Sequence, residues 1–101
     1  MKGEKGEAYD FNRAVQYGSD TCQPCGALET KLGAWVKEQE GIEYSYVSVE
    51  LEPAKAAQQG VFTVPAIVVY MDGKEITRRA GYFSLDELLA QVEDIKTRIE
   101  G

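Results

Sequence analysis

The sequence Thr21-Cys22-Gln23-Pro24-Cys25 holds both cysteines of the 101-residue chain, and a predicted helix begins within it. Pro24 fits the first helical turn, where the amide hydrogen that proline lacks would have no partner anyway. Cys22 would then stand at the helix N-terminus, where unpaired backbone amides and the helix dipole favour a thiolate. Cys25 follows on the same helical face, within reach of the first sulfur. This arrangement favours one accessible, acidic thiol and one shielded thiol that resolves its reactions.

Three other interpretations of the cysteine pair remain open. A structural disulfide would close a loop of only four residues and would constrain the unfolded chain by ~1.9 kcal/mol. Two thiolates are half of a zinc or iron–sulfur ligand set, so a metal site would need ligands from another subunit. The two thiols could also be buried and inert. The position of the pair, between a strand and a helix, favours thiol–disulfide exchange.

Composition excludes several other classes of function. The chain has 11 basic and 17 acidic side chains and a net charge of −6, which argues against nucleic acid or an anionic membrane as the main partner. It has no histidine, so Ser-His-Asp sites, Cys-His sites and histidine-ligated metals are excluded. We find no apolar run long enough to cross a membrane and no apolar signal region near Met1, and we expect a cytoplasmic protein.

Periodicity and turn signals predict one α/β domain over residues 13–101, preceded by an arm at 1–12 that could hold a helical turn around 9–12. Proline and glycine divide the domain into segments. Its strands are predicted at 13–17, 42–49, 66–71 and 74–80, and its helices at 23–40, at 53–60 and after a capping box at 84–87. The order β-α-β-α-β-β-α predicts a three-layer sandwich of three helices around a four-stranded mixed sheet. The helices between the first three strands would allow those strands to run parallel, and the Asp72-Gly73 hairpin makes the last strand antiparallel to its neighbour.

The wider pattern resembles the thioredoxin family. A strand, a Cys-x-Pro-Cys motif and a helix are followed forty residues later by Val64-Pro65 at the head of an apolar strand. Two glycines also match the family at fixed offsets, Gly73 eight residues and Gly81 sixteen residues after Pro65. The segment Glu50-Leu51-Glu52-Pro53 is similar to the acidic strand end and helix-opening proline of that family. The resemblance covers about residues 13–100.

The resemblance implies a thioredoxin-like fold and a catalytic pair, Cys22 and Cys25. It also implies a cis Val64–Pro65 peptide that faces the cysteines, with the Val64 backbone pairing with the substrate chain. Pro65 could instead be trans and only start a strand, and Gly81 could form a simple turn rather than a wall of the groove. The residues expected to contact substrate are Thr21, Gln23, Pro24, Val64, Pro65 and Gly81.

The expected partners are disulfide-containing proteins and a thioredoxin-reductase-type electron donor. Cys22 would attack a partner's disulfide, and Cys25 would then resolve the mixed disulfide, which requires no bound cofactor and no metal. We expect a monomer.

Five positions depart from the family pattern. Thr21 stands where thioredoxins carry tryptophan, Gln23 where they carry glycine, and Thr30 where the helix has a kinking proline. Gln16 replaces a buried aspartate, and the lysine that accompanies this aspartate corresponds to Tyr46. Without that carboxylate we expect slower turnover than in a typical thioredoxin, because Cys25 has lost its proton acceptor.

Three alternatives to a protein disulfide reductase remain. Thr63-Val64-Pro65 is also similar to glutaredoxins, but these use a lysine just ahead of the cysteines to hold glutathione, where this chain has Gly18, Ser19 and Asp20. A glutathione-dependent reductase therefore ranks second. The others are a non-catalytic binding module and a metal or cluster carrier that bridges two chains.

Overall fold

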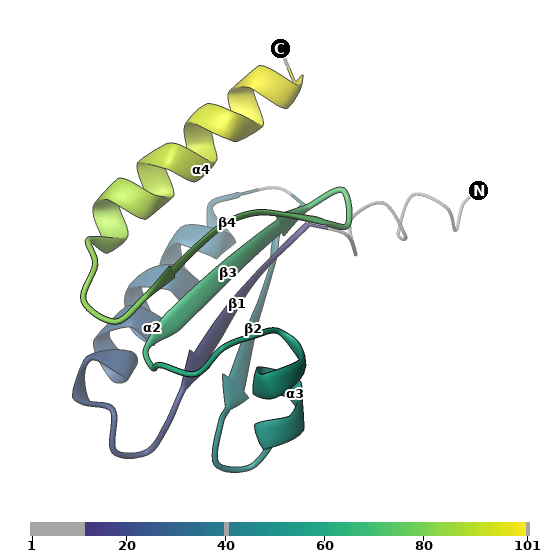
Figure 1. The fold of residues 1–101 in the computed structure, drawn as a ribbon. Helices are drawn as coiled ribbons and strands as arrows, with labels where there is room; N and C mark the ends of the chain where they lie inside the picture. Colours follow the sequence, from purple (N-terminus) through teal and green to yellow (C-terminus); the bar gives the residue numbers. More distant parts are fainter. Residues whose placement is uncertain (1–11, 40, 101) are drawn as a thin grey trace.

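Among the described residues, four strands and three helices follow one another in the predicted order (Figure 1). The computed structural model describes residues 12–39 and 41–100. The predicted arm therefore lies outside the described residues except for Asn12. None of the described helices is both long enough and apolar enough to cross a membrane. The elements are β1 (Arg13–Gly18), α2 (Gln23–Lys37), β2 (Glu43–Ser48), α3 (Pro53–Gln58), β3 (Ala66–Met71), β4 (Lys74–Ala80) and α4 (Leu85–Glu100).

The sheet is mixed, with the strand order β2-β1-β3-β4. β1 and β2 are parallel, whereas β3 is antiparallel to both β1 and β4. The expectation that the third strand could run parallel to the first two was therefore wrong. The six residues of α3 span only about 9 Å, too short a helix to return the chain along a strand of about 20 Å. β3 consequently starts at the end of the sheet where β2 stops, with Ala66 beside Tyr17.

Alternating side chains of the strands build two cores, one on each face of the sheet. α2 and α4 cover one face and α3 covers the other (Figure 1). β3 is central and buried on both faces, as its continuous apolar run predicts. The predicted apolar faces of α2 and α4 supply the first core, of which Leu32, Leu88 and Val92 are fully buried. Together these layers hold the C-terminal end of β1 and the start of α2 in fixed positions.

The turns follow the sequence signals with small shifts at the ends of elements. Asp72 and Gly73 both have positive φ, which is the two-residue turn that suits a hairpin. The Ser84 hydroxyl accepts a hydrogen bond from the Glu87 amide and caps α4. The helix predicted over 23–40 ends at Lys37 instead, because the next two amides bond to carbonyls three residues back and tighten the last turn.

Candidate functional site

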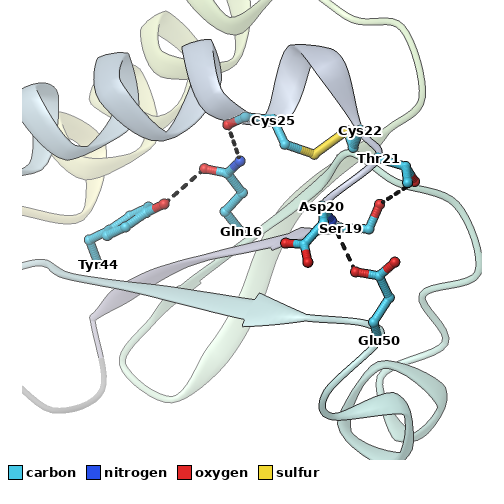
Figure 2. Close-up of a disulfide and its surroundings, with 8 residues drawn as sticks. All are labelled: Gln16, Ser19, Asp20, Thr21, Cys22, Cys25, Tyr44 and Glu50. Atoms are coloured by element: carbon cyan, nitrogen blue, oxygen red, sulfur yellow. Dashed lines mark hydrogen bonds between the residues drawn. A yellow bond between two sulfur atoms is a disulfide. The ribbon is translucent and has the colours of Figure 1, made fainter.

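Cys22 and Cys25 are joined by a disulfide at the N-terminus of α2 (Figure 2). Cys22 is the N-cap residue, and Pro24 lies in the first turn as predicted. Cys22 is half-buried, whereas Cys25 is only 2% exposed. The bond contradicts the interpretation of two inert thiols, and it leaves one sulfur open to attack and the other shielded.

One open groove of about 910 Å³ lies next to Cys22. All six residues that the sequence predicted to contact the substrate line this groove. The structure adds three residues that the sequence analysis had not selected for contact, namely Ser19, Thr63 and Tyr82. The Tyr82 side chain is fully exposed at the rim. Only the position of Tyr82 directly after Gly81 could have indicated that it lines the groove, since an aromatic side chain is usually assigned to the core.

The opposite wall of the groove is held by Pro65 and Gly81. The Val64–Pro65 peptide bond is cis, and only bonds that precede proline adopt this form at low cost. The Gly81 amide donates a hydrogen bond of 2.9 Å to the Pro65 carbonyl. Gly81 has a φ of +79°, a left-handed conformation that side chains other than glycine's rarely adopt. Gly81 therefore forms both the turn and the groove wall, two roles that the sequence had presented as alternatives.

Gln16 connects the sheet to the buried cysteine (Figure 2). Its side chain is 0% exposed. The amide nitrogen Nε2 donates to the Cys25 carbonyl at 2.9 Å, and Oε1 accepts a hydrogen bond from the Tyr44 hydroxyl at 2.9 Å. Tyr46 lies opposite Gln16 in the β1–β2 register, but the described hydrogen bond to Gln16 comes from Tyr44. A neutral amide thus occupies this position, with both polar atoms satisfied.

A Gln16→Leu variant is expected to lose about 1–3 kcal/mol of unfolding free energy, because two buried hydrogen bonds disappear and their partners remain. Urea unfolding of the oxidised protein measures this loss. Gln59→Leu is the matched control, since Gln59 is exposed and accepts one hydrogen bond from Tyr70; it should change stability by less than about 0.5 kcal/mol. Equal effects of the two substitutions would contradict a structural role for the Gln16 network.

Acidic side chains gather beside the motif. The Asp20 amide donates to a carboxylate oxygen of Glu50 at 3.0 Å, which ties the β1–α2 loop to the end of β2 (Figure 2). The hydroxyls of Ser19 and Thr21 are 3.2 Å apart and hydrogen-bonded. Within the described residues, no group of three or more cysteine or carboxylate side chains is placed to hold a metal ion. The site therefore consists of a disulfide and a groove, with the carboxylates of Asp20 and Glu50 near the β1–α2 loop.

Comparison with known proteins agrees with this geometry. The family model described as Thioredoxin matches residues 10–94. The thioredoxin of Chlamydia caviae is 29% identical over 75 residues, which cover 74% of each chain. The SPbeta prophage-derived thioredoxin-like protein YosR of Bacillus subtilis is 34% identical over 83 residues, covering 79% of this chain and 98% of YosR. The structure of thioredoxin 1 from Thermosipho africanus superposes with a TM-score of 0.82 at 27% identity, covering 88% of this chain and 99% of that one.

Proposed function

The chain belongs to the thioredoxin family of thiol–disulfide oxidoreductases, and from this premise we propose that it reduces disulfides of partner proteins through Cys22 and Cys25. One observation carries the proposal. The accessible sulfur of Cys22 opens onto a peptide-sized groove, while its disulfide partner Cys25 is buried directly behind it. Family members act on disulfide-containing proteins and receive electrons from reductases, and we propose both kinds of partner for this chain.

In the proposed cycle, the Cys22 thiolate attacks one sulfur of a partner disulfide and forms a mixed disulfide. Cys25 then attacks Cys22, the partner leaves with two thiols, and the protein keeps the internal disulfide. A reductase returns the two electrons. Reduction of insulin with dithiothreitol as electron donor tests the activity, and a rate no faster than that of dithiothreitol alone would contradict it.

The groove supplies the contacts that hold the partner chain in this proposal. Thr21, Gln23 and Pro24 would contact it from the start of α2, and the Val64 backbone, Pro65 and Gly81 from the opposite wall. Tyr82 adds an exposed aromatic ring at the rim. Backbone pairing at Val64 would not depend on the side chains of the partner, so this wall would contribute affinity with little dependence on sequence.

We also propose a direction for the exchange and a compartment in which it takes place. A reductant must be recharged by donors that keep thiols reduced, and the cytoplasm supplies them. We therefore propose a cytoplasmic reductant, and as a separate proposal that it works as a monomer. Cell fractionation tests the location, and sedimentation of the purified protein tests the oligomeric state.

The alkylation rate of Cys22 in the reduced protein is expected to rise with pH with a midpoint of about 7 or above. The N-terminus of α2 favours the thiolate, whereas Asp20 in the preceding turn opposes it through like charge. Cys25 is shielded, so rapid alkylation with iodoacetamide reports Cys22. A midpoint well below 6 would contradict this account of the site.

An Asp20→Asn variant separates the effect of the Asp20 charge on the Cys22 thiolate from the effect of the helix N-terminus. Removing the negative charge should move the alkylation midpoint to lower pH, by less than about one unit because solvent screens the charge. Asp72→Asn is the matched control, since it makes the same charge change in the β3–β4 hairpin and asparagine accepts the left-handed backbone there. Its midpoint should equal that of the wild type.

A further inference from the structure

Resolution of the mixed disulfide requires that the surroundings of Cys25 stabilise a buried thiolate. When Cys22 holds a substrate, Cys25 must become a thiolate although it is 2% exposed, and burial disfavours that charge. The described hydrogen bonds of the Gln16 amide run elsewhere, because its nitrogen donates to the Cys25 carbonyl and its oxygen accepts from Tyr44. Another side chain, however, carries a donor near the sulfur.

Tyr46 of β2 places its hydroxyl in the neighbourhood of this sulfur. A Cβ atom on Gly18 would lie within 3.0 Å of both the Tyr46 hydroxyl oxygen and the Cys25 Sγ atom. Gly18 has no side chain, so the phenol and the sulfur border the same small space at the end of β1. The Tyr46 side chain is 36% exposed, so its ring also reaches solvent.

We propose that the Tyr46 hydroxyl donates a hydrogen bond to the Cys25 thiolate and so promotes resolution of the mixed disulfide. The inference deepens the proposed reductase cycle and rests on it. The Cys25 thiol gives its proton to solvent, and its thiolate attacks Cys22 Sγ. A Cys22–Cys25 bond forms as the bond between Cys22 and the substrate sulfur breaks. The substrate sulfur leaves with that electron pair and is protonated by solvent. Two electrons pass from the dithiol to the substrate, and Tyr46 keeps its own proton.

The charges around Tyr46 suit a hydrogen-bond donor. Burial raises the pKa of Tyr46 above its ordinary value of 10.0, and the carboxylates of Glu29, Asp20 and Glu50 raise it further. These carboxylates belong to α2, to the β1–α2 loop and to the segment after β2. A raised pKa means that the phenol stays protonated as pH rises through the range in which thiols titrate.

A Tyr46→Phe variant tests the proposal, because it removes the hydroxyl and keeps the ring. The reduced protein is mixed rapidly with a symmetric aryl disulfide that releases one coloured thiolate when Cys22 attacks and a second when Cys25 resolves. We expect the first phase to change by less than about twofold and the second to slow by about tenfold, as for a lost hydrogen bond to a charged group. The pH at which the second phase is half-maximal should rise by about one unit.

Tyr70→Phe is the matched control, since its hydroxyl bonds to Gln59 on the far side of the sheet and both phases should stay unchanged. Urea unfolding of both variants establishes that they are folded. An unchanged second phase in Tyr46→Phe, or equal slowing of both phases, would overturn the proposal for Tyr46. Absence of the first phase in the wild type would instead contradict the proposed function itself.

Discussion

A Cys22→Ser variant is expected to reduce insulin no faster than dithiothreitol does alone. The thiolate is the attacking species in thiol–disulfide exchange, and a serine hydroxyl is not ionised at neutral pH. Cys25 cannot replace Cys22 because its sulfur is buried behind the first helical turn. Turbidity of the released insulin chains gives the rate.

The Cys22→Ser variant also distinguishes the reductase from its alternatives. Its circular dichroism should match that of the reduced wild type, which shows that the fold is intact. Residual reductase activity well above background would contradict the role given to Cys22. Unchanged binding to natural partners and an unchanged cellular phenotype would favour a non-catalytic binding module.

A Cys25→Ser variant is expected to remain covalently joined to its substrates. Cys22 can still attack, but serine cannot resolve the mixed disulfide, so turnover falls to background and the adduct persists until an added thiol releases it. Non-reducing electrophoresis followed by mass spectrometry detects the adduct and identifies the partner proteins.

The double variant Cys22→Ser/Cys25→Ser is the control for Cys25→Ser and should trap nothing. An adduct that forms as readily in Cys22→Ser as in Cys25→Ser would reverse the roles of the two sulfurs. Rapid spontaneous decay of the Cys25→Ser adduct would show that another group resolves it.

Local sequence signals predicted the cysteine motif and the start of the helix that carries it. Pro24 and the cysteine spacing indicated a helix that starts at the motif, and this helix begins at Gln23 with Cys22 as its cap. The resemblance to thioredoxins, through the offsets of Pro65 and Gly81, implied the opposite wall, and both residues line the same groove as Cys22. The start of the helix could be predicted because backbone rules for proline and helix ends act over a few residues.

Longer-range features were harder to predict. The direction of β3 depends on the length of α3 relative to the strands, which a pattern of elements does not express. Tyr44 and Tyr46 lie two apart on β2, and therefore on one face. Only the packed side chains show that Tyr44 bonds to Gln16 while Tyr46 borders the Cys25 sulfur.

The most direct test of the account is the thiol stoichiometry of a single turnover. Fully reduced protein is mixed with an equimolar peptide that contains one disulfide, quenched with acid, alkylated and mapped by mass spectrometry. We predict that each reduced peptide disulfide is matched by one Cys22–Cys25 disulfide, so that two thiols appear on the peptide as two disappear from the protein. A reduced peptide with both protein thiols still free, or a protein that ends as a stable adduct on a single cysteine, would contradict the dithiol–disulfide cycle.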